Sequence, residues 1–285
     1  MTSVVIAAYN EGRVIGRCLD ALLADSAGRL EVVVAANGCR DDTVDQARRP
    51  GVVVLDLPRP GKPAALNAAE RRVSTFPRVY LDADMQLTAR DLDRLAAALD
   101  DRVAGERTPL AAAPRREVDT TGSAFLVRQY HRALGLHPAY RHSLFGRGVV
   151  MLSERGRTRF DEFPEVLADD FFLDSLFSPD EKVVVPDVVS VVDAPSSTRV
   201  LLRRLARVRR GNRELRVSTS AGAAARPAEG LGWLLEAVRR DPRLLPAAVT
   251  YVLVTIYAEL AARWGGSSWG HDQSLPNPAR VREAT

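Results

Sequence analysis

Two aspartates one residue apart, Asp82 and Asp84, have the types and the spacing in this sequence that point most directly to chemistry. They lie at the end of the run 78–82, which we predict to be a β-strand. Side chains two positions apart on an extended chain point the same way, so both carboxylates can face one target. Oxygen ligands of this kind suit Mg²⁺ or Mn²⁺, whose shell a substrate diphosphate commonly completes. The alternative is an ordinary loop start whose aspartates cap the next turn.

A second acidic pair, Asp169 and Asp170, lies in the first turn of an apolar segment that we predict to be a helix near 167–177. A positioned carboxylate can take the proton of a hydroxyl group as that hydroxyl attacks a substrate. Acidic residues are also favoured at a helix N-terminus by the helix dipole, which would explain the pair without catalysis. Both interpretations stay open at this point.

These residues need a scaffold, and the first hundred positions predict one. Short β-branched runs alternate there with amphipathic helical patterns, which is typical of βαβ units in a parallel sheet. We predict a helix over 11–24 with Asn10 as its N-cap, and another that Thr88 caps. Ligands of parallel sheets bind at the carboxyl ends of the strands, so the polar residues there should converge. The strands that we predict are 3–8, 30–36, 52–56 and 78–82.

The remainder of the chain is less regular. Residues 105–148 read as loops around one helix over 121–134. Beyond them we expect strands at 148–152, 182–186 and 188–192, an arginine-rich helix at 198–216, a mobile Ala/Ser/Gly-rich connection at 218–230 and an apolar helix at 244–262. The apolar helix carries Pro246 and Glu259, which interrupt its apolar pattern. We therefore expect a core helix, a dimer contact or a helix on a membrane surface, in preference to a helix that spans the membrane.

Four ordered motifs resemble family 2 glycosyltransferases over nearly the first 215 residues. They are Val4–Glu11 (VVIAAYNE), Asn37–Thr43 (NGCRDDT), Gly61–Asn67 (GKPAALN) and Leu81–Asp84 (LDAD). The resemblance implies the α/β GT-A fold, which is a Rossmann-like, mostly parallel sheet flanked by helices, here with a helical C-terminal extension. It also implies an inverting, nucleotide-sugar-dependent transferase. We therefore expect a GT-A domain over 1–216, made of a nucleotide-binding half (1–104), an acceptor half (105–197) and a basic closing helix (198–216), followed by the extension 217–285.

The resemblance also implies roles for single residues. Tyr9 would contact the base and Asp82 the ribose, Asp84 would bind the metal, and Asp170, beside Asp169, would be the catalytic base. The nucleotide-sugar-binding set that we expect is Ala8, Tyr9, Glu11, Asn37, Asp41, Lys62, Asn67, Asp82, Ala83 and Arg207, and Gly146 and Gly148 would form an acceptor turn.

Alternatives remain for several of these residues. Asp41 can cap a helix, Lys62 can be a solvated surface lysine, and the two glycines can make a plain turn. Many relatives carry an acid that contacts uracil where this chain has Ala35 and Ala36, which leaves the choice of UDP over GDP in doubt. A UDP-sugar is nevertheless the donor that we favour.

The arginine-rich segment invites three explanations. It can close over a diphosphate through Arg207, form a solvated basic face, or attract anionic lipid headgroups. The formal net charge of the whole chain is only +4, and the segment lacks interleaved aromatic residues, so we expect no nucleic-acid partner. Cys18 and Cys39 show no disulfide or zinc spacing, and the N-terminus shows no secretion signal. We expect a cytoplasmic protein, with the inner face of the membrane as a further place of association.

The sequence thus predicts a glycosyltransferase that uses Mn²⁺ or Mg²⁺ and a nucleoside-diphosphate sugar, with a glycan, a lipid-linked or a small-molecule acceptor. One alternative is a sugar-phosphate nucleotidyltransferase, although Asn10-Glu11-Gly12 offers one glycine where several backbone donors would be needed to cradle a triphosphate. Another is a binding protein whose basic helix engages a membrane or nucleic acid. The acceptor, the sugar and the oligomeric state are not set by any pattern that we recognise.

Overall fold

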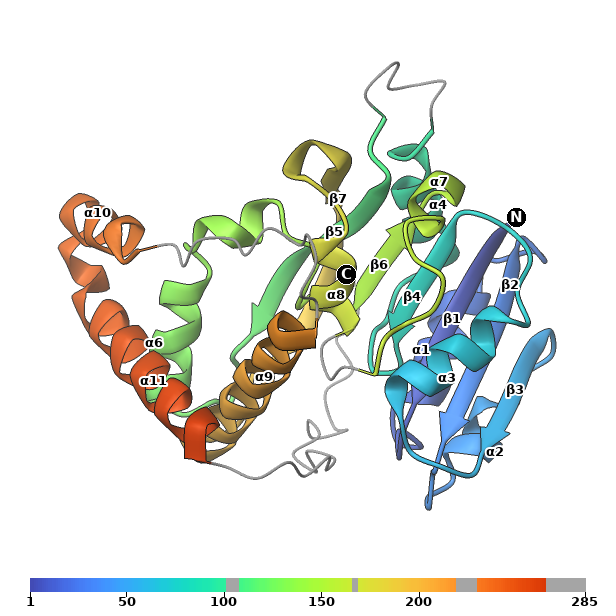
Figure 1. Cartoon of the computed structure of the whole chain (residues 1–285), viewed down its shortest axis with the longest axis horizontal. Helices are drawn as coiled ribbons and strands as arrows, with labels where there is room; N and C mark the ends of the chain where they lie inside the picture. Colours follow the sequence, from blue (N-terminus) through green and yellow to red (C-terminus); the bar gives the residue numbers. More distant parts are fainter. Residues whose placement is uncertain (101–107, 166–168, 219–229, 265–285) are drawn as a thin grey trace. The chain divides into compact units, whose positions relative to one another are not determined.

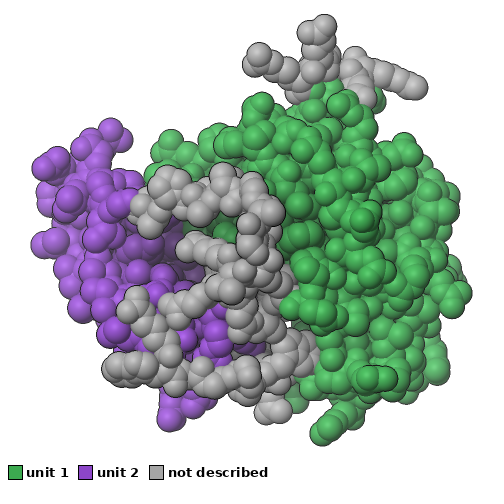
Figure 2. All heavy atoms as spheres, viewed as in Figure 1, with its two compact units in different colours: residues 1–117, 138–192, 211–227 green, residues 118–137, 193–210, 228–285 purple. Residues whose placement is uncertain are grey.

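The computed structural model describes residues 1–100, 108–165, 169–218 and 230–264. These residues fall into two compact units, which Figure 2 colours separately. Unit 1 comprises residues 1–117, 138–192 and 211–227, and unit 2 comprises residues 118–137, 193–210 and 228–285. The connection predicted at 218–230 lies outside the described residues except for its two end positions, and so does the predicted start of the helix near 167.

A seven-stranded sheet with the order β3-β2-β1-β4-β6-β5-β7 forms the framework (Figure 1). The four strands β3, β2, β1 and β4 are parallel, and β6 runs antiparallel to both β4 and β5. This is the mixed, largely parallel sheet that the sequence predicts. The strands are β1 Thr2–Ala8, β2 Leu30–Asn37, β3 Val52–Leu57, β4 Arg78–Asp82, β5 Ala111–Asp119, β6 Val149–Leu152 and β7 Lys182–Asp193.

Helices flank this sheet in unit 1 and make up most of unit 2. In unit 1 they are α1 Ile15–Leu23, α2 Thr43–Ala47, α3 Lys62–Glu70, α4 Ala89–Ala97, α7 Glu154–Arg157 and α8 Asp169–Ser175. In unit 2 they are α6 Phe125–Leu134, α10 Gly232–Arg240 and α11 Leu245–Trp264, while α9 Thr198–Ser218 has residues in both units. The 3₁₀ turns are η2 Pro138–Arg141, η3 Pro179–Glu181 and η4 Pro242–Leu244.

The sheet of unit 1 separates two apolar layers, and alternate residues of β1 serve each layer. Val4 and Ile6 pack in the layer that also contains buried residues of α1 and α4. Val5, between them, packs in the layer that contains buried residues of α3 and α8. Strands buried on both faces read as continuous apolar runs, which explains why β1, β2 and β4 were predictable from sequence.

Several element predictions are confirmed and others are wrong. Thr88 caps α4, and its hydroxyl and the Asp91 carboxylate form a reciprocal capping box. The first helix, however, begins at Ile15, because Asn10 adopts a positive φ of 54° and its side chain accepts a hydrogen bond from the Arg40 amide. Strand β5 lies within the region predicted to be loops. The two strands predicted over 182–192 are one, since an edge strand tolerates Pro186.

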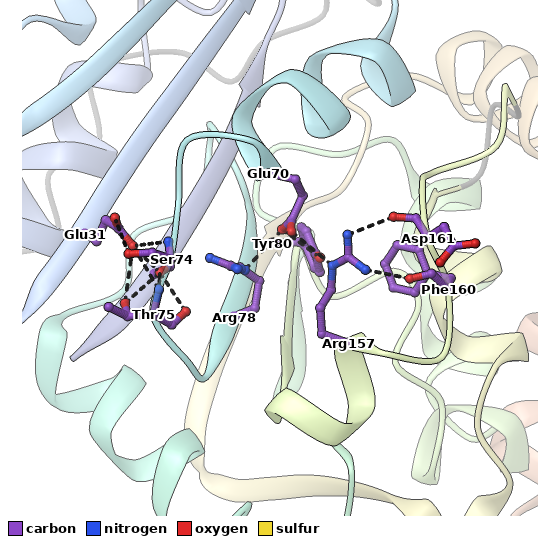
Figure 3. Close-up of polar contacts among 10 residues, drawn as sticks. Glu31, Glu70, Ser74, Thr75, Arg78, Tyr80, Arg157, Phe160 and Asp161 are labelled. Atoms are coloured by element: carbon purple, nitrogen blue, oxygen red, sulfur yellow. Dashed lines mark hydrogen bonds and ion pairs between the residues drawn. The ribbon is translucent and has the colours of Figure 1, made fainter.

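The buried carboxylate of Glu70, the last residue of α3, connects this helix to β4 and α7 (Figure 3). It accepts the Tyr80 hydroxyl at 2.9 Å and pairs with Arg78 Nε at 3.2 Å and Arg157 Nε at 3.0 Å. Arg157 also donates to the Phe160 and Asp161 carbonyls. The network therefore links α3 to β4 and to the segment that follows α7.

We predict that Glu70→Gln lowers the free energy of unfolding by about 3 kcal/mol, because it leaves two buried guanidinium groups without their counter-charge. The matched control is Glu162→Gln, which breaks the exposed ion pair with Arg71 and should cost less than about 0.5 kcal/mol. Urea denaturation of the two variants measures both values. Equal losses would show that the Glu70 network does not hold unit 1 together.

Candidate active site

Lys62 joins the two acidic pairs that the sequence analysis singles out. It is the first residue of α3, and its Nζ lies 2.8 Å from Asp82 Oδ1, at the end of β4, and 3.0 Å from Asp169 Oδ2, at the start of α8. Burial alone would lower the pKa of Lys62, but Asp169 and Asp82 together raise it well above its ordinary value. The lysine is therefore a permanent cation that links segments more than 80 residues apart in the sequence.

Asp170 is held by two backbone N–H groups. Its Oδ2 accepts from Gly146 at 2.7 Å and its Oδ1 accepts from Phe171 at 2.8 Å. Burial and the neighbouring Asp169 raise the pKa of Asp170 to about 6, against the opposing effect of the Gly146 hydrogen bond. A fixed carboxylate that titrates just below neutral pH has the properties of a general base. Asp170 and Asp169 line the same cavity as Lys62, Asp82 and Gly148.

Acidic side chains converge where the parallel strands end. Glu11, which follows β1, has a pKa raised to about 8 by burial and then by the charges of Asp84, Asp82 and Asp41. Its Oε2 atom is buried and accepts no hydrogen bond. Asp84 itself is exposed, while Ala83 between the two aspartates is buried. The carboxyl edge of the sheet thus carries a concentration of negative charge that the single lysine does not balance.

This negative charge fits a divalent cation. Within the described ranges no three His, Cys, Asp or Glu side chains gather closely enough to enclose a metal ion. A cation at Asp84 would therefore draw several of its oxygen ligands from a substrate, which is how Mg²⁺ and Mn²⁺ commonly bind beside phosphates. The unpartnered Glu11 oxygen and the charges around it show that these residues suit such an ion.

Asn37 ties three chain segments together at this edge. Its Nδ2 donates to the Ala8 carbonyl at 2.8 Å, and its Oδ1 accepts from the Gly61 amide at 3.0 Å. The side chain is almost fully buried and is engaged at both ends of its amide. Asn37 therefore holds the end of β1 against the start of α3, a structural task that sequence reasoning missed.

Asp41 makes local turn contacts. Its Oδ2 accepts from the Gly12 amide at 3.0 Å, and its Oδ1 accepts from the Thr43 amide at 3.1 Å and the Thr43 hydroxyl at 2.5 Å. Thr43 Oγ1 in turn accepts from the Glu11 amide at 2.7 Å. These bonds fix the loop that carries Glu11, while Tyr9 beside it is half-buried. Local turn chemistry accounts for the position of Asp41.

The two glycines of the expected acceptor turn have different surroundings. Both adopt a φ of +69°. At Gly148 an added Cβ would lie 2.5 Å from Met85 Sδ, so the turn into β6 packs tightly against the turn that follows β4. The Gly148 carbonyl also accepts from the Asp82 amide at 2.8 Å. Gly146 is more open, with Tyr140 3.7 Å from such a Cβ, and its amide bonds Asp170.

Buried charged side chains that sequence reasoning missed hold this turn and α8. Arg147 is 1% exposed and donates to the Ser143, Pro114 and Tyr140 carbonyls. In α8 the Asp174 carboxylate pairs with Lys182 at 2.9 Å and accepts from the Leu144 amide at 2.8 Å. The one available signal was Lys182, one of only two lysines in the chain, which is the first residue of an apolar strand.

The remaining expected residues lie elsewhere. Asn67 exchanges two hydrogen bonds with the Phe163 backbone, at 3.0 and 2.8 Å, and so fixes the segment before α8. Ala8 is buried, and its carbonyl accepts the Asn37 bond described above. Arg207 is half-buried on α9 and belongs to unit 2, whereas the other expected site residues belong to unit 1. Its role over a diphosphate stays a prediction.

Comparison with known sequences places this arrangement in context. The profile of the family described as Glycosyl transferase family 2 matches residues 3–119. Uncharacterized glycosyltransferases of Mycobacterium tuberculosis and Mycobacterium bovis are 33% identical to the chain over 160 residues, which covers 52% of this chain and 71% of each relative.

Solved structures share the fold. The mannosyltransferase PcManGT from Pyrobaculum calidifontis, in complex with GDP-Man and Mn²⁺, matches with a TM-score of 0.63 at 21% identity, over 92% of this chain and 87% of that one. Glucosyl-3-phosphoglycerate synthase from Mycobacterium tuberculosis, in complex with Mn²⁺, UDP-glucose and glycerol 3-phosphate, matches with a TM-score of 0.51 at 19% identity, over 75% and 78% of the two chains. At these identities the likeness shows the GT-A fold, as predicted from sequence.

The pKa of Asp170 leads to a prediction about stability. Because folding raises this pKa from 3.8 to about 6, the bound proton stabilises the fold at low pH, and that stabilisation is lost as the pH rises through about 6. Asp170→Asn removes the titrating group, and at every pH it also removes one of the two backbone hydrogen bonds, because the asparagine amide nitrogen cannot accept. The free energy of unfolding of the variant relative to the wild type should therefore be about 1 to 3 kcal/mol higher above about pH 7 than at about pH 4.

Urea denaturation at the two pH values, without divalent cations, measures the difference. Asp161→Asn, at an exposed position, is the control and should change stability by less than about 0.5 kcal/mol at both values. A difference between Asp170→Asn and the wild type that is the same at both pH values would mean that folding does not raise the pKa of Asp170, contrary to this assignment.

Proposed function

We propose that this chain, which belongs to glycosyltransferase family 2, transfers a sugar from a nucleoside-diphosphate sugar to a hydroxyl group with inversion at the anomeric carbon. The observation that carries the proposal is the meeting of two acidic pairs around Lys62, one at the end of β4 and one at the start of α8. The first pair suits the charged donor, and the second suits proton removal from an acceptor.

Donor binding rests on the acidic edge of the sheet. In this proposal Asp84 holds a Mn²⁺ or Mg²⁺ ion, Asp82 contacts the ribose, and Tyr9 lies against the base. When bound, the ion neutralises charge on the departing nucleoside diphosphate. The charges that raise the pKa of Glu11 support a cation here, since a cation would relieve their mutual repulsion. The complexes of PcManGT and of glucosyl-3-phosphoglycerate synthase contain Mn²⁺ beside a nucleotide sugar.

Proton removal rests on Asp170. The acceptor oxygen forms a bond to the anomeric carbon while the bond from that carbon to the phosphate oxygen breaks, and the acceptor proton passes to the Asp170 carboxylate. A single displacement of this kind inverts the anomeric centre. The Gly146 and Phe171 amides fix both oxygens of Asp170, which supports a base of defined orientation.

Lys62 serves both halves of the reaction in this proposal. Its ammonium group pairs with Asp169 and with Asp82 and so links α8 to β4. It also lies beside Asp82, within the region proposed for the donor, where a compact cation can bind a phosphate as a point charge. Asp82 is 45% exposed, so a ligand can reach this ion pair from solvent.

The nucleotide base is the open feature of the donor. The side-chain amide of Asn37 is hydrogen-bonded to backbone groups, and the carboxylate of Asp41 accepts hydrogen bonds from Gly12 and Thr43. Neither side chain therefore replaces the acid that many relatives carry at the end of β2 to contact uracil. A UDP-sugar remains the donor that we propose. The two solved relatives are bound to GDP-Man and to UDP-glucose, so both nucleotides belong in the same test.

We predict that one nucleoside diphosphate, with Mn²⁺, raises the melting temperature of the protein by about 5 °C, since a ligand of the native state stabilises it by mass action. The panel is UDP, GDP, ADP and CDP, each with Mn²⁺ or with EDTA. Asp84→Asn should abolish the metal-dependent part of the shift, whereas Asp187→Asn, at an exposed position in β7, should keep it. A full metal-dependent shift in Asp84→Asn would remove Asp84 from the metal site.

Asp170→Asn should spare donor binding but slow transfer by about 10²- to 10⁴-fold, because it deletes the proton acceptor and leaves the nucleotide edge intact. The wild-type rate should fall as the pH drops below about 6, where Asp170 becomes protonated. Release of nucleoside diphosphate, assayed against a panel of acceptors, follows turnover, and Asp161→Asn should retain the wild-type rate. Normal transfer by Asp170→Asn would mean that another residue is the base.

A further inference from the structure

Helix α11 presents an apolar face to solvent as well as to its own unit. Its buried side includes Ala247, Tyr251, Val254 and Ala258. Tyr251 stacks on Tyr130 of α6, with ring centroids 5.5 Å apart, and α6 and α11 lie side by side in Figure 1. The opposite side forms an apolar stripe whose members are between 42 and 62% exposed: Leu245, Val249, Leu253, Ile256, Tyr257 and Leu260.

The stripe carries no charged residue. Between Leu245 and Ala262 the helix contains one charged residue, Glu259, and it does not belong to the stripe. Glu259 forms an ion pair with Arg209 of α9 at 3.2 Å. Apart from the adjacent Ile256 and Tyr257, the stripe members recur at spacings of three or four residues along about four turns of helix, so they form one continuous surface. A continuous exposed apolar surface of this length marks a contact with another apolar body.

Basic side chains accompany the stripe. Between the exposed Leu235 of α10 and Leu245 of α11 lie three exposed arginines, Arg239, Arg240 and Arg243. Arg240 pairs with Glu236. The described residues of unit 2 contain twelve arginines and five acidic residues, although the formal net charge of the whole chain is only +4. A second copy of this surface would bring like charges together, whereas an anionic surface complements them.

We infer that the stripe of α11 and the neighbouring arginines dock unit 2 onto an anionic lipid surface, with α11 lying in the plane of the headgroups. The segment Pro242–Ala262 is long and apolar enough to cross a bilayer, with a mean hydropathy of 1.7. Its buried half, however, is committed to α6 and other parts of unit 2, so lipid can surround the exposed half alone. Apolar residues on one side with arginines beside them are the features of an interfacial helix, and the cytoplasmic leaflet supplies anionic headgroups.

Co-sedimentation of the full chain with lipid vesicles tests this inference and needs no glycosyl transfer. The wild type should bind vesicles of phosphatidylcholine mixed with phosphatidylglycerol, bind pure phosphatidylcholine more weakly, and lose the difference at high salt. Leu253→Gln with Ile256→Gln should weaken binding by at least about tenfold. The matched control, Val53→Gln with Val191→Gln, changes similarly exposed apolar residues of unit 1 and should bind as the wild type does.

A second pair of variants tests the charge. Arg239→Gln with Arg243→Gln should reduce binding to the anionic vesicles by about fivefold per arginine, while Arg72→Gln with Arg155→Gln, exposed arginines of unit 1, should not. Circular dichroism confirms that each variant is folded.

Three results would overturn the inference. They are a wild type that stays in the supernatant with anionic vesicles, stripe variants that bind as tightly as the wild type, and a dimer in light scattering that the stripe variants convert to a monomer.

Discussion

The site is governed by an excess of negative charge at one edge of a parallel sheet. Burial, and then the charges of Asp84, Asp82 and Asp41, raise the pKa of Glu11 there to about 8. Lys62 neutralises part of this negative charge by forming ion pairs with Asp82 and Asp169. Such an arrangement costs stability in the free protein, and a cation bound together with a diphosphate would relieve it. The same electrostatic demand explains both the proposed metal and the proposed donor.

Buried polar contacts keep these charges in place. Asn37 fixes the start of α3 against the end of β1, and Glu70 fixes the other end of α3 to β4. The Asp174–Lys182 pair anchors α8, which carries the proposed base. Each contact buries polar groups with partners, so losing one partner leaves an uncompensated group in the core. Binding and proton transfer therefore depend on residues that touch no substrate in the proposal.

The parts of the fold and of the site that could be predicted are those that local sequence patterns determine. The strands β1, β2 and β4 are apolar and buried on both faces, and β4 ends at Asp82, two residues before Asp84. The sheet and its acidic edge could therefore be predicted from sequence. Strand β5 was missed because its arginines and Pro114 interrupt the apolar pattern. The helix after β1 was placed too early because Asn10 bonds Arg40, far away in sequence. Asn37, Arg147 and Asp174 act through long-range backbone contacts, for which sequence spacing gives no signal.

The central claim is that the turn of Asp82 and Asp84 binds a cation that also binds the donor diphosphate. Anomalous X-ray scattering from crystals grown with Mn²⁺ and the nucleoside diphosphate that stabilises the protein tests it most directly. The account predicts one manganese peak within about 2.3 Å of an Asp84 carboxylate oxygen and of phosphate oxygens. A bound nucleotide whose phosphates lie away from this turn, with no manganese at Asp84, would contradict it.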